Sequence, residues 1–219
     1  MYQKGEQSML ALDHIVIAAK APKTSAMEFS EKHHVIVVEG GKHKNWGTYN
    51  YLAYFGNQCY IEWLGIYDEE IARKSDNPLI EQLVDAYEKN FEGPIQYALR
   101  TEQMDDYLNY FNALNLSYVG PIPGSRNKPD GTGLKWRMLF PKASTPTPFL
   151  IEWEKEKNLP SDKNLINSQL IHTIYSSSLD EDIFKLPLEN HTARLENALL
   201  ITGNIFGFQI KKTITLPKK

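Results

Sequence analysis

The sequence predicts an α+β fold in which two βαβββ modules form one curled mixed sheet around a cup, followed by a partial third α/β unit. Two observations lead to this prediction. The same order of strands and helices occurs on both sides of a helical segment in the 219-residue chain. The tripeptide Ile-Glu-Trp also occurs twice, at 61–63 and 151–153, in runs that otherwise resemble buried strands. A carboxylate is costly to bury unless it is paired or metal-bound, so its repetition indicates a repeated unit.

The first module is expected within residues 1–70, in the order strand, helix and three strands. Its five elements are expected at residues 10–19, 24–34, 35–38, 48–56 and 57–66. Ser25 and Glu28 have the spacing of a capping box, which indicates the start of the helix. Gly56 and Asn57 lie between the last two strands and predict a tight hairpin turn.

The segment 71–92 is expected to form a helix that connects the modules. Asn77 is a suitable N-cap before Pro78, and the apolar residues that follow have helical spacing. The second module, 93–157, repeats the element order of the first. Its elements are expected at residues 94–101, 104–114, 116–122, 133–140 and 148–154.

Residues 158–219 are expected to form a partial βαββ extension that packs on the two modules. Residues 168–177 have the pattern of a strand. Residues 198–212 predict a hairpin that turns at Gly203 and Asn204.

Composition limits the classes of function. Lys and Arg number 24 and Asp and Glu number 27, so the net charge is −3, and no basic stripe predicts a nucleic-acid partner. No apolar run is long enough to span a bilayer, and the N-terminus lacks the apolar core of a signal peptide. The single cysteine, Cys59, has no partner for an internal disulfide. We therefore expect a cytoplasmic protein without a membrane or nucleic-acid partner.

Strand alternation predicts which side chains face the cup. In each module the helix needs the apolar face of the strands, so the polar residues that alternate with that face belong on the concave side. Four such residues lie on the first and last strands of the two modules: His14, Glu62, Gln96 and Glu152. They converge in one cup if the two sheets pair.

The chain resembles the vicinal oxygen chelate superfamily and, within it, the glyoxalase-like domain proteins. Several segments carry this resemblance in the expected order: LDHIVIAA at 12–19, GGKHKNWGTYNYLAYFG at 40–56, YIEWL at 60–64, ALRT at 98–101, RNKPDGTGLKWR at 126–137 and PFLIEW at 148–153. The resemblance implies paired βαβββ modules whose sheets curl around a small-molecule site. It also implies a divalent cation, such as Zn, Ni, Fe, Mn or Mg, at the positions of His14, Glu62, Gln96 and Glu152, and no nucleotide cofactor.

The resemblance implies a metal-dependent lyase or isomerase that acts on a small oxygenated metabolite. Glu62 and Glu152 are then the candidate catalytic residues, because a glutamate would move the proton beside the substrate carbonyl. Ala98 instead of Gln96 is the alternative residue at the third ligand position. The candidate substrate-binding residues are His43, Asn50, Arg100, Arg126 and Trp136.

An alternative function from another class is a metal-free binding or sequestering protein, like the antibiotic-binding members of the superfamily. In that protein the glutamates of the cup would pair with arginine or with a cationic ligand. Two fused modules close one cup within a single chain, so both a monomer and a homodimer are compatible with the sequence.

Overall fold

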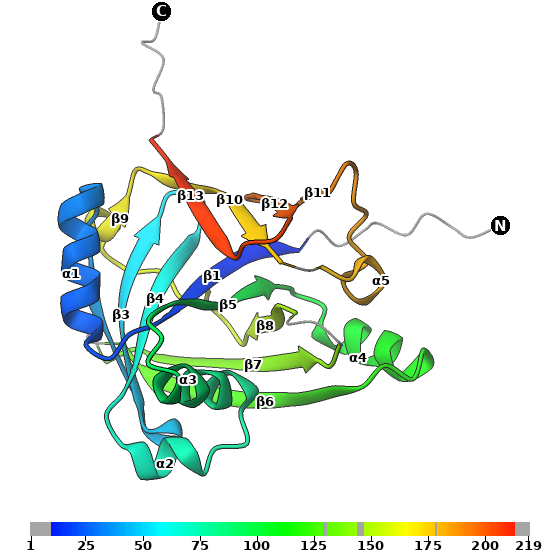
Figure 1. The fold of residues 1–219 in the computed structure, drawn as a ribbon, viewed down its shortest axis with the longest axis horizontal. Coiled ribbons are helices and arrows are strands. Elements are labelled where there is room, and N and C mark those ends of the chain that lie inside the picture. The colour runs from blue at the N-terminus through cyan, green and yellow to red at the C-terminus, as the bar shows by residue number, and fades with distance from the viewer. Residues whose placement is uncertain (1–9, 129–130, 144–146, 178, 213–219) are drawn as a thin grey trace, which may run out of the picture.

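The computed structural model describes residues 10–128, 131–143, 147–177 and 179–212. It contains a strongly curled mixed sheet, a second smaller sheet and a few short helices (Figure 1). The predicted α+β class and the curled sheet built from two modules are therefore confirmed.

The first module comprises β1 (Ala11–Ala18), α1 (Pro22–His33), β2 (Val38–His43), β3 (Thr48–Phe55) and β4 (Cys59–Ile66). The second comprises β5 (Gly93–Arg100), α4 (Met104–Ala113), β6 (Tyr118–Asn127), β7 (Gly133–Pro141) and β8 (Phe149–Trp153). The strand order is β2-β3-β4-β1-β5-β8-β7-β6, so the modules meet where β1 pairs antiparallel with β5. In each module the last strand returns parallel to the first, as β4 does to β1 and β8 to β5.

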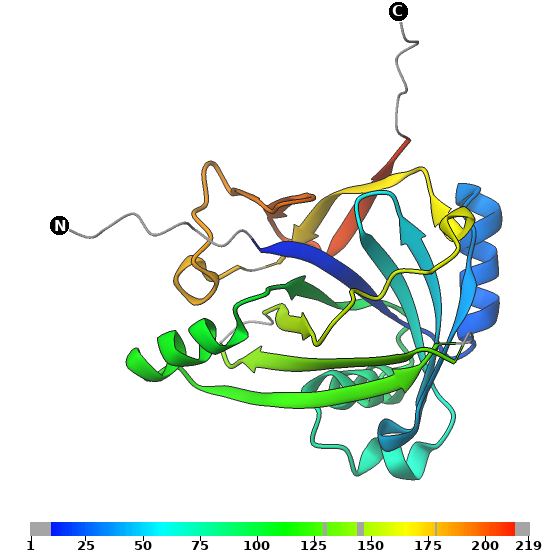
Figure 2. The same cartoon turned by 180° about the vertical axis from the view of Figure 1, so that it is seen from behind.

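The curl brings the two edge strands, β2 and β6, close to each other. Arg126 on β6 donates from Nη1 to the backbone oxygen of Gly40 on β2 at 2.6 Å. The connection from β8 to β9 (Ile166–Asn167), which includes η2 (Lys163–Leu165), then runs back across the sheet to pair with β3 (Figure 2).

The connecting segment forms two helices, α2 (Glu69–Arg73) and α3 (Pro78–Glu88), of which only α3 was predicted. Asn77 caps α3 as predicted, because its side chain accepts a hydrogen bond from the Leu79 amide. Leu79, Ile80 and Leu83 of α3 pack against the apolar residues on the concave side of the sheet. The helix thus fills part of the cup and leaves a smaller cavity beside it.

A second core cluster lies on the outer side of the sheet, between α1, α4 and the small sheet. The small sheet and its helix comprise β10 (Leu170–Ser176), α5 (Glu181–Phe184), β11 (Thr192–Arg194), β12 (Leu199–Thr202) and β13 (Gly207–Lys211). Its order is β11-β12-β10-β13, with β12 parallel and β13 antiparallel to β10. Since β4 and β5 flank β1 in the same way, the extension repeats part of the module plan.

Three local predictions are wrong. The capping box at Ser25 and Glu28 does not start α1, because that helix begins at Pro22, whose fixed φ suits the first helical turn. The second strand, expected at residues 35–38, instead spans Val38–His43, because Gly40 and Gly41 lie within β2 and the chain turns later, in η1 (Lys44–Trp46). The hairpin at 198–212 does not form, because β10 lies between β12 and β13.

Candidate functional site

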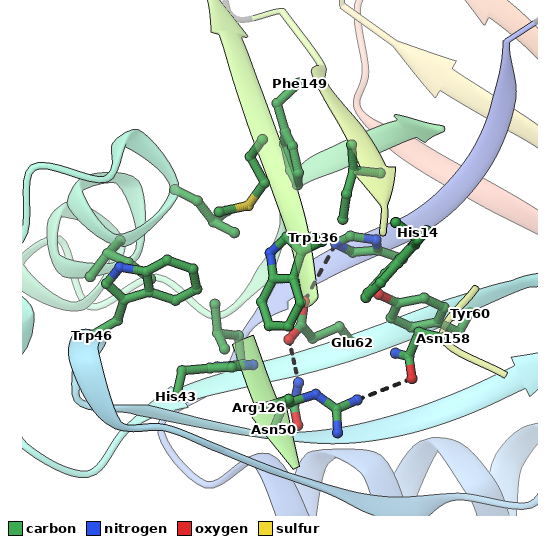
Figure 3. Close-up of a pocket in the computed structure, with 16 residues that line it drawn as sticks. His14, His43, Trp46, Asn50, Tyr60, Glu62, Arg126, Trp136, Phe149 and Asn158 are labelled. Carbon is green, nitrogen blue, oxygen red and sulfur yellow. Dashed lines mark hydrogen bonds and ion pairs between the residues drawn. The ribbon is translucent and has the colours of Figure 1, made fainter. Parts of the chain in front are cut away.

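The cup contains a cavity of about 40 Å³ on the concave side of the curled sheet (Figure 3). Side chains from β1, β2, β3, β4, β6, β7 and β8 line it, together with Leu79 and Ile80 of α3. Such a volume holds one or two water molecules. The cavity therefore accommodates a small reacting group.

Three side chains form a carboxylate–imidazole–carboxylate chain at the wall of this cavity. His14 Nδ1 lies 2.7 Å from Asp13 Oδ1, and His14 Nε2 lies 3.5 Å from Glu62 Oε2. All three residues are buried, and the His14 ring stacks on Tyr60 with centroids 4.6 Å apart. The Asp13 carboxylate fixes the ring orientation, so Nε2 faces Glu62 and the cavity.

A β-bulge places Asp13 beside His14. Consecutive residues of a strand normally point to opposite faces, but the β1–β5 register shifts between Leu12 and His14 and leaves Asp13 as the extra residue. Burial alone would raise the pKa of Asp13. The hydrogen bond and the charge of His14, the charge of Arg100 and the Trp153 hydrogen bond outweigh burial and hold this pKa below its ordinary value. Asp13 is therefore an anion that orients the imidazole.

Asn50 and Arg126 complete the polar side of the cup. Asn50 Nδ2 donates to Glu62 Oε1, which leaves Oε2 directed to His14. The Arg126 guanidinium is buried and donates to the Gly40 carbonyl and, at 3.1 Å, to Asn158 Oδ1. The wall of the cup thus contains the positively charged Arg126 guanidinium and the oriented Glu62 carboxylate (Figure 3).

His43, Trp46 and Trp136 lie at the mouth of the cup. The two indole centroids are 6.1 Å apart, and His43 is within 6.0 Å of both rings. Burial lowers the pKa of His43 to about 4, since the positive charge of Arg126 adds to the effect of desolvation, and the charge of Glu62 offsets it only in part. His43 is consequently neutral at pH 7, with Nδ1 3.0 Å from the Thr48 hydroxyl.

Glu152 lies outside the cup, and its predicted concave orientation is wrong. On β8, Phe149, Ile151 and Trp153 line the cavity, so Glu152 points to the helix side. There its Oε1 accepts from the Met104 amide at the start of α4, and its Oε2 accepts from Arg137 Nε at 2.6 Å. The carboxylate therefore stabilises a helix N-terminus and forms an ion pair.

The strand pairs explain why the two Ile-Glu-Trp runs differ. His14 pairs with Tyr60 and Val16 with Glu62 in the first module, whereas Ala98 pairs with Phe149 and Arg100 with Ile151 in the second. Because His14 and Ala98 face each other across the module junction, Ile151 is the counterpart of Glu62. Glu152 is then the counterpart of Trp63, which packs against Phe29 of α1.

The same pairs decide between Gln96 and Ala98 at the third ligand position. Ala98 lies opposite His14, and Gln96 lies opposite Val16. Instead, Gln96 Nε2 donates to the Thr147 carbonyl at 3.0 Å, and Gln96 Oε1 accepts from the backbone amide of Tyr97. Gln96 is buried, but it does not line the cup.

The donor set of the cup does not match the four-ligand site that the resemblance implied. The first module supplies His14 and Glu62, while the corresponding residues of the second module, Ala98 and Ile151, have no side-chain donor atoms. Within the described ranges, no group of three or more His, Cys, Asp or Glu residues is placed to hold a metal ion.

Arg100 also differs from its predicted role in substrate binding. Its Nη1 lies 3.2 Å from Asp13 Oδ2 and 3.0 Å from the Gln58 carbonyl, and it is absent from the cavity lining. Trp153 Nε1 donates to the same Asp13 oxygen at 2.9 Å. Both residues therefore hold Asp13 in place.

The structure brings five of the predicted site residues to the cup besides His14: Glu62, His43, Asn50, Arg126 and Trp136. Sequence reasoning missed Asp13, Asn158 and Trp153. The adjacent Asp13-His14 pair was the available signal, but strand alternation assigned the two side chains to opposite faces. Nothing in the sequence indicated that Asn158, after the second module, folds back to Arg126.

Comparisons with known proteins agree with this architecture. A family model described as a glyoxalase-like domain matches residues 12–183. A hypothetical protein from Staphylococcus aureus has a similar structure, with a TM-score of 0.69 at 21% identity, over 91% of this chain and 89% of that one. A methylmalonyl-CoA epimerase from Streptomyces coelicolor, in complex with 2-nitronate-propionyl-CoA, has a TM-score of 0.50 at 16% identity, over 69% of this chain and 100% of that one.

A hypothetical protein from Bacillus halodurans C-125 has the same TM-score and identity and is covered over 99% of its length. At these identities the likeness concerns the fold. No curated protein matches the sequence. Among the described residues, no helix is long and apolar enough to cross a membrane.

Proposed function

Because the chain belongs to the glyoxalase-like domain family, we propose that it is an isomerase or lyase that moves a proton beside the carbonyl group of a small oxygenated metabolite. The observation that supports this proposal is the chain Asp13–His14–Glu62 at the wall of the cup. A positioned carboxylate next to an oriented imidazole is a suitable acid–base pair. The small cavity suits the reacting carbon and its carbonyl group.

The proposed step begins at Glu62, which takes the proton from the carbon next to the carbonyl. The electron pair of the broken C–H bond forms a C=C bond while the π pair of the C=O bond moves to the oxygen, and the Arg126 guanidinium stabilises the resulting enolate. His14, oriented by Asp13, exchanges the proton with Glu62. The proton then returns to an adjacent carbon in an isomerase, or the enolate expels a leaving group from the next carbon in a lyase.

A proton-exchange experiment tests this function across several classes of carbonyl compound at once. The protein is incubated in D₂O with 2-oxo acids, 2-hydroxyaldehydes and hemithioacetals, and loss of the C–H signal is followed by ¹H NMR. We expect exchange with one of these classes and a decrease of roughly 10²–10⁴-fold in Glu62→Gln and in His14→Gln. Glu152→Gln is the matched control, and full exchange in that variant would also exclude the catalytic role predicted for Glu152.

The alternative proposal is a metal-free protein that binds or sequesters a small molecule. The apolar second half of the cup favours it. Ligand binding measured together with C–H exchange separates this alternative from the proposed enzyme. Saturable binding of a small molecule without exchange would support sequestration, whereas exchange that disappears in Glu62→Gln would support proton transfer.

A further inference from the structure

A groove of about 390 Å³ lies beside the mouth of the cup. Its volume is within the range of roughly 300–1,000 Å³ that is usual for small-molecule sites. The end of β2 with η1 forms one wall and β6 forms the other, where the two edge strands of the curled sheet approach each other. Its lining residues include Lys42, Lys44, Asn45, Ser125 and Arg126.

The charge of this groove is of one sign. Lys42, Lys44 and Arg126 are its charged lining residues, and no carboxylate lines it among the described residues. Neither lysine forms an ion pair within the described part of the chain. Lys42 lies over the Tyr67 ring at 4.8 Å from its centroid, which restrains the ammonium group. In a chain with a net charge of −3, this is a local concentration of unpaired positive charge.

The groove continues into the cup. His43, Trp46 and Arg126 line both spaces. The groove and the cavity therefore adjoin each other at these three residues.

A second open groove, of about 780 Å³, adjoins the cup at Trp136 and Trp153. Its two cationic side chains are already paired, because Arg137 contacts Glu152 at 2.6 Å and Lys135 contacts Glu154 at 3.6 Å, and Glu102 adds a further negative charge to its lining. The groove with Lys42 and Lys44 consequently offers the stronger attraction for a charged ligand.

We propose that the substrate is an anionic metabolite whose phosphate or carboxylate group binds to Lys42 and Lys44 while its carbonyl end enters the cup. The assignment rests on the proposed proton-transfer function, to which it adds the substrate class. Arg126 lines both spaces, so the guanidinium that stabilises the enolate also adds its positive charge to the groove. His43, neutral at pH 7, contributes no charge to anion binding.

Binding of simple anions tests the groove independently of turnover. The ¹H–¹⁵N spectrum is recorded during titration with inorganic phosphate, pyrophosphate or malonate at constant ionic strength. We expect saturable chemical-shift changes at the amides of Lys42–Trp46. The anion that binds more tightly, phosphate or malonate, indicates whether the substrate carries a phosphate or a carboxylate group. Lys42→Gln/Lys44→Gln should weaken pyrophosphate binding at least about tenfold. The control Lys23→Gln/Lys32→Gln removes two exposed charges from α1 and should change it less than about twofold.

The outcomes separate this inference from the proposed function. Saturable binding that Glu62→Gln retains supports the groove even if no C–H exchange is found. Two results would overturn the groove as the anion site and leave the proton-transfer function in place. The first is C–H exchange whose KM is unchanged in Lys42→Gln/Lys44→Gln. The second is an α1 control that weakens pyrophosphate binding as much as Lys42→Gln/Lys44→Gln does. Absence of saturable shifts in the wild-type protein also overturns it.

Discussion

At the scale of single residues, the environment of His14 depends on an irregularity in a strand. A regular β1 would direct Asp13 to the side opposite His14. The bulge directs both side chains to one side, where Arg100 and Trp153 bind the second oxygen of Asp13. The sequence identified His14 as a pocket residue from alternation alone, but a bulge depends on the pairing of β1 with β5, which alternation does not reveal.

The low pKa of His43 predicts how the free energy of unfolding changes with pH. Its folded-state pKa of about 4 lies below the ordinary value of 6.5, so the unfolded chain binds more protons between these values. Stability is therefore fully present above pH 6.5 and decreases as the pH falls toward 4. We expect the wild-type protein to lose on the order of 3 kcal/mol more than His43→Gln between pH 7 and pH 4.

Urea unfolding at half-unit pH intervals measures this difference. His43→Gln is suitable because glutamine retains a polar group near Thr48 and does not titrate. The other titrating groups, including Asp13, are present in both proteins and cancel in the comparison. Parallel stability curves for the two proteins would contradict the assigned state of His43.

At the scale of elements, hydrophobic periodicity predicted the strands and helices of both modules better than it predicted their faces. Trp63 and Glu152 occupy equivalent positions on β4 and β8, and both contact the helix of their own module. The shared Ile-Glu-Trp sequence therefore lies on equivalent strands, but its glutamate faces the cup in β4 and the helix side in β8. A shift of one residue exchanges the two faces of a strand, and the tripeptide alone does not define that phase.

Because Glu152 faces the helix side of β8, it has a structural role that can be measured. Glu152→Gln removes a charge from the N-terminus of α4 and weakens the bond to Arg137, so we expect a loss of about 1 kcal/mol in the free energy of unfolding. Glu154→Gln is the control, because Glu154 is exposed and lies 3.6 Å from Lys135, and it should change stability by less than about 0.5 kcal/mol. Equal losses in urea unfolding would argue against helix stabilisation by Glu152.

The prediction of the extension failed at the level of pairing. Two strands joined by Gly203 and Asn204 have the local signature of a hairpin. They are instead separated by β10, which offers both of its edges to them. This preference arises from a strand about 25 residues earlier in the sequence, so a local turn signal could not reveal it.

At the scale of the whole molecule, the extension shares its core with the two modules. Ile171, Ile174 and Leu200 belong to the same buried cluster as Leu12 and Ile15 of β1. The extension also repeats the bulge of the first module: the β10–β13 register shifts at His172, as the β1–β5 register shifts at Asp13. The repeated plan and the shared core indicate that the extension stabilises the strand that carries His14.

Asn197 forms the most direct link between the extension and β1. Its Oδ1 accepts from the Leu12 amide at 2.8 Å, and its Nδ2 donates to the Leu12 carbonyl at 2.9 Å. The side chain thereby pairs with Leu12 as a neighbouring strand would, immediately before the bulge. It also donates to the Asn57 carbonyl at 2.8 Å, which ties the β3–β4 turn to the same point.

Removal of the extension should therefore unfold the modules. A chain that ends at residue 157 exposes the apolar residues of β1 and α4 that the small sheet covers, so we expect loss of the cooperative unfolding transition and of dispersed amide signals. Asn197→Ala in the full-length chain is the graded companion and should cost about 2 kcal/mol, because it leaves the buried Leu12 backbone groups without partners. A shortened chain that unfolds cooperatively with wild-type stability would show instead that residues 1–157 form an independent domain, and that His14 is positioned by the two modules alone.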